Sequence, residues 1–256
     1  MNHWDAGLAG LVAMAAAAFV VWMVSIWKRN VSIVDVLWSL MFLIGALVYA
    51  RTTVPGPRAS WLVWLVALWA LRLAIYIAAR NWGHPEDRRY QAIRARNDPG
   101  FAFKSLYLVF LLQAVLASIV ALPLLGATTG QSAVGWLDFA GIVLFAFGFL
   151  FEAIGDWQLS RFKADAANKG KVMRTGLWRF TRHPNYFGEF CVWWGFYLIA
   201  LAAGAWWTIP GPLLISFLLL RVSGVRLLEK DIGKRRPEYA DYIRQTNAFF
   251  PGPSRE

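Results

Sequence analysis

Long apolar stretches alternate with short polar segments along the whole chain. A helix that crosses a lipid bilayer needs roughly 20 mostly apolar residues, and seven stretches reach or approach that length. Their expected bounds are 7–27, 33–50, 60–80, 103–126, 135–157, 184–203 and 206–228. The pattern therefore predicts an all-α polytopic membrane protein, a bundle of seven transmembrane helices in one integral-membrane domain over residues 1–256, with a polar tail at 229–256.

The composition agrees with this pattern. The chain is 58% hydrophobic and only 16% charged, whereas soluble domains carry about 25% charged residues. Cys191 is the only cysteine, and the three histidines, His3, His84 and His183, lie far apart in the sequence. No disulfide within the chain is possible, and no ligand spacing suggests a zinc site, so we expect no metal centre.

The net charge of +11 carries information about topology. Nearly all of the 26 Lys and Arg residues fall in alternate loops and in the tail, on one side of the predicted bundle. The positive-inside rule then predicts an N-terminus outside and a C-terminus in the cytosol. We expect no nucleic-acid partner, and a location in the plasma membrane of a bacterium or the endoplasmic reticulum of a eukaryote.

Ionisable residues occur within several of the predicted spans, near their cytosolic ends. Such residues are costly in lipid and usually face the bundle interior or a cavity. Glu152 and Asp156 are four apart, so they share a helix face. The sequence therefore predicts one polar cavity that opens to the cytosol, lined by Asp35, Trp69, Arg72, Tyr76, Glu152, Asp156 and Glu189.

Simpler interpretations of these residues stay open. Arg72 would also serve as a structural partner for Asp35 or Glu152. Asp35 and Asp156 lie close enough to the membrane surface to be solvated, and aromatic residues at helical spacing are often packing residues.

The segment Arg182–Glu189 (RHPNYFGE) combines several functional groups at the start of the sixth predicted span. Pro184 suits the first turn of a helix, and the free N–H groups of such a turn bind anions. Asn185, Tyr186 and Glu189 would share one face of that helix. A helix cap with Arg182 at the membrane surface is the alternative.

At this segment the sequence resembles a known family. Gly176–Glu189 (GLWRFTRHPNYFGE) is similar to the C-terminal signature of the steroid 5α-reductases and their bacterial relatives, the DUF1295 group. The tail from Gly224 to Pro251 and the segment Val34–Trp38 (VDVLW) fit the same family. The resemblance implies a monomeric membrane reductase that binds NADPH from the cytosol and takes a lipophilic substrate from the bilayer, among membrane lipids. It would reduce a C=C bond conjugated to a ketone, as in 3-oxo-Δ4 steroids.

The resemblance also implies catalytic residues. The family's catalytic carboxylate corresponds to Asp35, and its intramembrane arginine corresponds to Arg72. The match departs from the mammalian pattern because Asp replaces Glu and Trp69 replaces a tyrosine. The phenol would then come from Tyr76, with Tyr49 and Tyr90 as alternatives. Trp38 and Trp69 are the expected substrate-binding residues.

The cofactor residues that the resemblance implies lie in the second half of the chain. Acids and amides would bind ribose or the nicotinamide, and basic residues would bind phosphates through charge-assisted hydrogen bonds. The expected residues are Glu152, Asp156, Lys163, Arg174, Trp178, Arg179, Arg182, His183, Asn185, Tyr186, Glu189, Arg226, Glu229, Tyr239 and Tyr242.

Two other functions remain as alternatives. Membrane methyltransferases that act on isoprenylcysteine or phospholipid amines use a similar Arg-His-Pro segment with S-adenosylmethionine. A proton-coupled transporter would use the intramembrane acids as a proton relay, but transporters often carry inverted repeats and broken helices, and neither is evident in this sequence.

Overall fold

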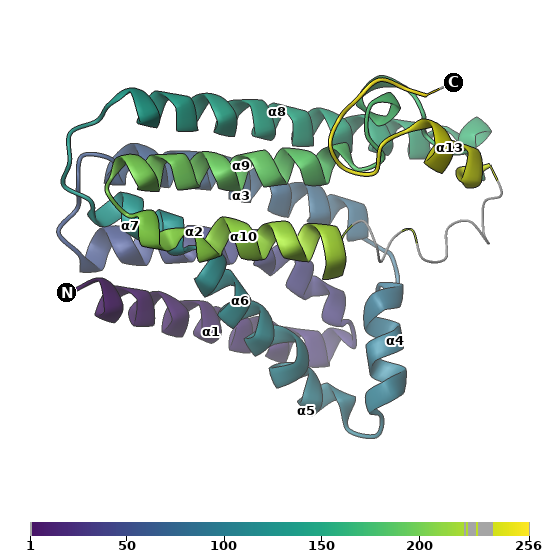
Figure 1. Cartoon of the computed structure of the whole chain (residues 1–256). Helices are drawn as coiled ribbons and strands as arrows, with labels where there is room; N and C mark the ends of the chain where they lie inside the picture. Colours follow the sequence, from purple (N-terminus) through teal and green to yellow (C-terminus); the bar gives the residue numbers. More distant parts are fainter. Residues whose placement is uncertain (1, 223, 225–228, 230–237, 256) are drawn as a thin grey trace. The chain divides into compact units, whose positions relative to one another are not determined.

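The computed structural model describes residues 2–222, 224, 229 and 238–255. These residues form helices, turns and loops, and no strand occurs among them. Figure 1 shows the helices, and the chain divides into two compact units. Unit 1 contains residues 1–134 and 200–210, and unit 2 contains residues 135–199 and 211–256.

Unit 1 is built from the first three predicted spans and the segment that follows them. In α2, Gly45 leaves room for the side chain of Met14 on α1, and Gly10 on α1 leaves room for Tyr49. The helices are α1 (His3–Lys28), η1 (Val31–Ile33), α2 (Val34–Thr52), α3 (Ala59–Asn81), α4 (Arg88–Asn97), α5 (Phe101–Ser105), the π-helical η2 (Leu106–Leu111), α6 (Leu112–Val120), α7 (Leu122–Thr129) and η5 (Trp206–Thr208).

Unit 2 contains the longest helix of the described chain and the C-terminal segment. Its elements are α8 (Trp136–Ala164), η3 (Ala166–Asn168), η4 (Gly176–Arg179), most of α9 (Pro184–Ala202), α10 (Pro210–Phe217), the π-helical η6 (Leu218–Val222) and α13 (Tyr239–Gln245).

Five helical segments of the described chain are long and apolar enough to cross a membrane, which supports an integral membrane protein. They are His3–Lys28, Val31–Thr52, Ala59–Asn81, Phe101–Val120 and Trp136–Ala164. The predicted count of seven is not confirmed. The sixth stretch forms α9, of 19 residues, and the seventh forms a shorter apolar segment, Trp206–Val222.

Two predicted spans differ from the helices of the structure. The stretch 103–126 is not one helix, because α6 ends at Val120 and α7 begins at Leu122, with Pro123 in its first turn. Proline lacks the N–H group that would continue the hydrogen bonding of α6. The stretch 135–157 continues as helix to Ala164, because the polar residues after Trp157 are good helix formers even though they are not apolar.

Close packing of α8 against α9 is the main feature that positions polar residues in unit 2. A Cβ atom on Gly188 would lie 2.5 Å from the backbone nitrogen of Glu152, and one on Gly148 would lie 2.6 Å from the carbonyl oxygen of Gly188. Gly195 is similarly close to the backbone of Phe145. Glycine at these positions therefore lets the two helix backbones touch.

Candidate functional site

The acid at the start of α2 is held by two donors from α4. Arg89 Nη2 donates to Asp35 Oδ2 at 2.7 Å, and the Tyr90 hydroxyl donates to Asp35 Oδ1 at 2.6 Å. Gln113 Nε2 in turn donates to the Tyr90 hydroxyl at 3.3 Å. Tyr90 is 6% exposed. We name these four residues, Asp35, Arg89, Tyr90 and Gln113, the Asp35 cluster.

The segment before α4 fixes this arrangement. Asp87 caps α4 by accepting the Arg89 N–H, and it also accepts from Arg89 Nε at 3.0 Å. The Asp87 N–H donates to Ser32 Oγ at 2.7 Å, and Glu86 accepts the Val31 N–H at 2.8 Å. Hydrogen bonds thus join η1, which leads into α2, to the residues that lead into α4, so the Asp35 cluster is preorganised.

The pKa values of Glu86 and Tyr90 are shifted by neighbouring groups and by burial. Burial opposes the ionisation of Glu86, but hydrogen bonds from Arg94 and from Val31 lower its pKa below the ordinary value. For Tyr90, burial and the charge of Asp35 both raise the pKa of the phenol, so it stays protonated. The segment therefore presents carboxylates as acceptors and Tyr90 as a donor.

The expected residues of α3 and α2 also lie in unit 1. Trp69 is fully buried and packs against Phe42, with ring centroids 5.8 Å apart, and Phe42 contacts Trp38 edge to face at 5.1 Å. Arg72 and Tyr76 are half-buried on α3. The Tyr76 ring lies 5.8 Å from the Arg80 guanidinium. The structure thus gives Asp35 a phenol partner from α4, whereas the sequence favoured Tyr76.

Unit 2 brings together the expected residues of α8 and α9. Glu152 and Asp156 are 2% and 3% exposed, and Glu189 is also buried. Asn185 Nδ2 donates to Asp156 Oδ1 at 3.2 Å, and Gly188 packs on the backbone of Glu152. The result is a polar face of two helices, which we name the α8–α9 face and define by Glu152, Asp156, Asn185 and Glu189.

The first turn of α9 begins at Pro184, as the sequence predicted. Its N–H groups are partly used within the turn, since Tyr186 donates to Asn185 Oδ1 and Phe187 donates to the His183 carbonyl. The rings of His183 and Tyr186 are stacked, with centroids 5.6 Å apart and planes 5° apart.

Arg182 binds the C-terminal segment through most of its donors. Its Nε and Nη2 atoms donate to the two oxygens of Glu229 at 2.7 and 2.9 Å, and its Nη1 atom donates to the carbonyls of Ile243 and Thr246. His183 Nε2 lies 3.0 Å from Glu229 Oε1. Arg182 and Glu229 therefore form an ion pair with each other. The hydrogen bonds of both side chains go to other residues of this chain.

The pKa of Glu229 reflects these contacts. Burial alone would raise it, but hydrogen bonds from His183 and Arg182 together with their charges lower the pKa of Glu229 to about 2. Arg182 correspondingly has a raised pKa, because the bond to Glu229 outweighs the effect of burial. The pair is therefore fully charged at neutral pH.

Further expected cofactor residues connect α13 to the end of α8. Trp178 Nε1 donates to the Gly155 carbonyl at 3.1 Å, and the Tyr242 hydroxyl donates to the Trp178 carbonyl. Tyr239 packs edge to face on Tyr242. Arg174 lies over the Tyr242 ring at 5.8 Å and donates to the Glu238 carbonyl. These contacts hold α13 against η4, and η4 against α8.

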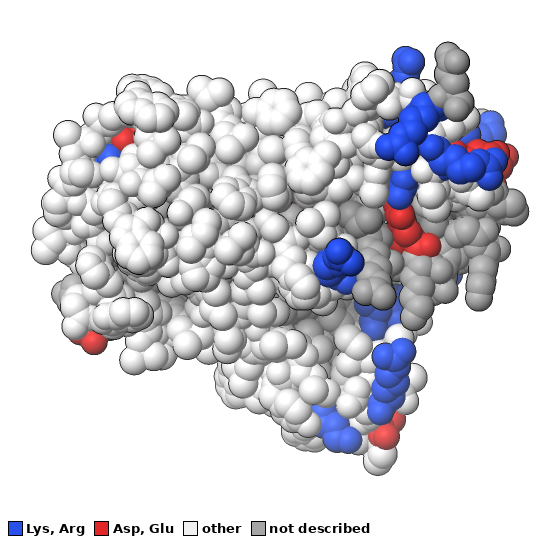
Figure 2. All heavy atoms as spheres, viewed as in Figure 1, with Lys and Arg blue, Asp and Glu red and all other residues white. Residues whose placement is uncertain are grey.

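The basic residues at this end of unit 2 are at the surface. Figure 2 shows Lys and Arg side chains gathered around α13 and the end of α8, and Arg161, Lys163 and Arg179 are exposed. In unit 1 the corresponding basic element is α4. Arg226, which the sequence placed in the cofactor site, lies outside the described residues.

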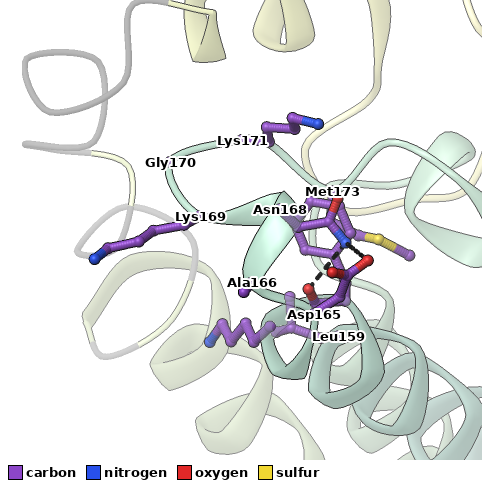
Figure 3. Close-up of a pocket in the computed structure, with 10 residues that line it drawn as sticks. Leu159, Asp165, Ala166, Asn168, Lys169, Gly170, Lys171 and Met173 are labelled. Carbon is purple, nitrogen blue, oxygen red and sulfur yellow. Dashed lines mark hydrogen bonds between the residues drawn. The ribbon is translucent and has the colours of Figure 1, made fainter.

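A hollow of about 300 Å³ lies between the end of α8 and the loop that follows it, lined by residues that include Lys163, Lys169 and Lys171. Figure 3 shows the side chains of Lys169 and Lys171 extending in different directions. Asn168 closes one wall by donating to the Phe162 carbonyl and to Asp165. The lysines do not converge on one point, so the hollow by itself defines no phosphate site.

Sequence reasoning missed Arg89 and Gln113. Arg89 was counted only among the loop charges, and Gln113 is an isolated polar residue in a predicted apolar span. A signal was present for Gln113, because a polar side chain within such a span needs a hydrogen-bond partner. For Arg89 no local signal distinguishes it from Arg88, since only the fold of α4 decides which arginine reaches Asp35.

Comparisons with known proteins identify relatives of the chain. The family described as "Protein of unknown function (DUF1295)" matches residues 21–246. An uncharacterised protein of Schizosaccharomyces pombe is 30% identical over 283 residues, a match that covers 94% of this chain and 78% of the yeast protein. No solved structure matches the chain significantly.

Proposed function

Because the chain belongs to the DUF1295 family, a group related to the steroid 5α-reductases, we propose that it is an NADPH-dependent reductase of a lipophilic enone. The substrate would resemble a 3-oxo-Δ4 steroid and would enter from the bilayer. The C=C bond conjugated to the ketone would be saturated, with a hydride added at the β carbon and a proton at the α carbon.

The observation that carries the proposal is the α8–α9 face. Three acids and an amide lie on two apolar helices, where ionisable groups are retained mainly for function. Carboxylates and amides suit the hydroxyl groups of ribose and the carboxamide of a nicotinamide. Basic residues at the same end of unit 2, including the exposed Lys163 and Arg179 and the half-buried Arg174, suit the phosphates. The donor set of unit 2 therefore fits a phosphorylated dinucleotide.

Within this proposal the residues have separate roles. Glu152, Asp156, Asn185, Tyr186 and Glu189 would hold the ribose and nicotinamide, and NADPH, when bound, would supply the hydride. Arg182, His183 and Glu229 would act indirectly, because their mutual hydrogen bonds fix the C-terminal segment. Tyr242 connects that segment to Trp178 of η4, and Tyr239 packs on Tyr242. Arg226 keeps its place as a proposed phosphate ligand.

The unit 1 residues would serve the enone. A carbonyl that gains negative charge during the reaction is stabilised most by donors fixed in advance in a water-poor site. Asp35 and its partners on α4 form such a group, Arg72 adds a positive charge from α3, and Trp38 and Trp69 would contact the apolar rings. We propose that the C-terminus lies in the cytosol, as the positive-inside rule predicts.

Thermal unfolding of the purified protein in detergent tests the choice of cofactor. A ligand that binds only the folded state at a hundred times its Kd stabilises it by about 2.7 kcal/mol. We expect NADPH to raise Tm, and NADPH to be oxidised on addition of a 3-oxo-Δ4 steroid. Stabilisation by S-adenosylmethionine instead would favour a methyltransferase. If neither nucleotide raises Tm, the result would favour the proton-coupled transporter.

A matched pair of variants tests the proposed site. Asp156→Asn removes the carboxylate that accepts from Asn185, and it should weaken NADPH binding about tenfold, since a charged hydrogen bond contributes about 1.5 kcal/mol or more. Asp165→Asn, on the exposed loop after α8, should leave NADPH binding unchanged. Equal affinities in the two variants would remove the α8–α9 face from the cofactor site.

A further inference from the structure

The hydrogen-bond donors of the Asp35 cluster come from α4 and α6. Each oxygen of Asp35 accepts a separate donor, Arg89 Nη2 at 2.7 Å and the Tyr90 hydroxyl at 2.6 Å. Both oxygens of Asp35 thus act as hydrogen-bond acceptors in this arrangement. The groups that can donate from this cluster are therefore Arg89, Tyr90 and Gln113.

One nitrogen of the Arg89 guanidinium, Nη1, is available to donate a hydrogen bond to a ligand. Its Nε and Nη2 atoms are held by oxygens of Asp87 and Asp35. Within the described residues, its Nη1 atom donates no hydrogen bond, and the side chain is 33% exposed. A guanidinium fixed on one edge by two carboxylates presents its other edge in a defined direction, as a donor for an oxygen.

The hydroxyl of Tyr90 is also oriented from two sides. Gln113 Nε2 donates to it, and it donates to Asp35. Gln113 is the second residue after the π-helical segment η2, Leu106–Leu111. A π-helical segment within an α-helix changes the register of the residues after it and is frequent at functional sites. The register of α6 is thus part of what brings Gln113 to Tyr90.

An apolar wall begins one turn further along α2. Trp38 is three residues after Asp35, so both lie on the same face, and Trp38 contacts Phe42, which contacts Trp69. Polar donors at the end of the helix followed by aromatic rings suit a flat apolar molecule with an oxygen at one end.

We propose that Arg89 and Tyr90 are the donors that meet the carbonyl oxygen of the substrate, and that Asp35 is the residue that positions them. Arg89 keeps its bond to Asp35 and donates through Nη1, whereas the hydroxyl of Tyr90 turns its single hydrogen from Asp35 to the carbonyl oxygen when the substrate binds. This inference rests on the proposed enone reduction and assigns within it a different donor from Asp35 itself. As the hydride adds to the β carbon, the carbonyl oxygen gains negative charge, which the hydrogen bonds from Arg89 and Tyr90 stabilise. A proton taken from water then adds at the α carbon of the enolate and completes the saturated ketone.

Infrared difference spectroscopy of a bound 3-oxo-Δ4 steroid, labelled with ¹³C at its carbonyl, tests the assignment without turnover. A hydrogen bond lowers the carbonyl stretching frequency, so the bound steroid should absorb at lower frequency than in an apolar solvent. Arg89→Gln and Tyr90→Phe should each move the band toward the apolar value. In steady-state assays each should lower kcat about a hundredfold or more, the effect of losing one donor to a developing oxyanion.

Two control variants match the substitutions. Arg88→Gln removes the same charge from the exposed neighbour on α4, and Tyr107→Phe removes a hydroxyl from an exposed tyrosine of η2. Both should leave the band and kcat unchanged.

Several outcomes would overturn the inference. A band that moves only in Asp35→Asn would make Asp35 the donor, and a band that moves only in Tyr76→Phe would assign the phenol to α3. If the wild-type protein reduces the steroid with NADPH while Arg89→Gln and Tyr90→Phe keep the band, the assignment is wrong and the proposed function stands. If NADPH neither stabilises the protein nor is oxidised, the proposed function fails and the assignment fails with it.

Discussion

Arg182 is 6% exposed and donates from three of its nitrogens to Glu229 and to two backbone carbonyls. A buried arginine is tolerated only when such partners replace the water that it has lost. Glu229 is its counter-ion, and His183 adds a second donor to the same carboxylate. At the scale of single residues, this pair holds the C-terminal segment against the start of α9.

Glu229→Gln should lower stability by about 3 kcal/mol at neutral pH, because it leaves the buried Arg182 without its counter-ion. The wild type should also show a matching pH dependence. The pKa of Glu229 is about 2 in the folded state against an ordinary value of 4.5. The stabilisation is therefore complete above about pH 4.5 and is lost as the pH falls toward 2. Tm measured in detergent across this range checks both statements.

The control is Asp241→Asn. Asp241 pairs with Arg244 on the exposed face of α13, where an ion pair contributes little, so its Tm should stay close to that of the wild type. If the Glu229→Gln variant loses stability in acid as steeply as the wild type, another group causes the loss of stability between about pH 4.5 and 2.

At the scale of elements, glycines determine how α8 and α9 meet. Gly141, Gly148 and Gly155 recur at every seventh residue of α8, and Gly188 and Gly195 do so on α9. A Cβ atom at Gly141 or Gly195 would lie within 2.8 Å of the facing helix. Small residues at such spacing let helices approach closely in a membrane, where packing drives their association.

Gly188→Ala should force the two helices apart. The added Cβ would lie 2.5 Å from the Glu152 nitrogen and 2.6 Å from the Gly148 carbonyl oxygen, and backbone atoms at these positions cannot rotate away. We expect a loss of about 2 kcal/mol or more, measured as a lower Tm, together with weaker stabilisation by NADPH because the α8–α9 face is disturbed.

Gly135→Ala provides the comparison, since a Cβ atom there would meet nothing within 4 Å. Its effect should stay below about 1 kcal/mol. Equal Tm values for the two variants would contradict the close packing of α8 on α9.

The elements differ in how far the sequence predicted them. Pro184 correctly predicted the start of α9 because proline acts through local sterics. Pro123 acted in the same local way, yet the break before α7 was missed because the apolar run continues through it. The sequence named Tyr90 only as an alternative to Tyr76 for the phenol, and it did not predict the contact of Arg89 with Asp35. Both contacts depend on how α4 folds back onto the start of α2.

At the scale of the whole molecule, charge is unevenly distributed in each unit. In unit 1 the arginines of α4 gather at one end, and in unit 2 basic residues surround α13, while much of the remaining visible surface is uncharged (Figure 2). Exposed aromatic side chains such as Trp27, Trp64 and Trp136 suit the membrane surface, where tryptophan is enriched.

Labelling with a membrane-impermeant maleimide tests the predicted orientation. In a Cys191→Ala background, which removes the single cysteine, Ser254→Cys in the tail should react only after a bacterial host is permeabilised. Ser60→Cys, exposed at the start of α3, should react in intact cells. The positive-inside rule predicts this result, and labelling of Ser254→Cys in intact cells would reverse the orientation.

The sequence by itself determined that the chain is helical, apolar and a member of its family, because hydropathy, proline and short motifs act over a few residues. It also named the acids and amides of the α8–α9 face. Only the tertiary structure decided that Tyr90 and Arg89 hold Asp35, and that Arg182 is bound by Glu229. The physical reason is that a hydrogen bond forms between whichever donor and acceptor the backbone brings within about 3 Å. Residues 47 to 55 positions apart meet at such distances only through the fold.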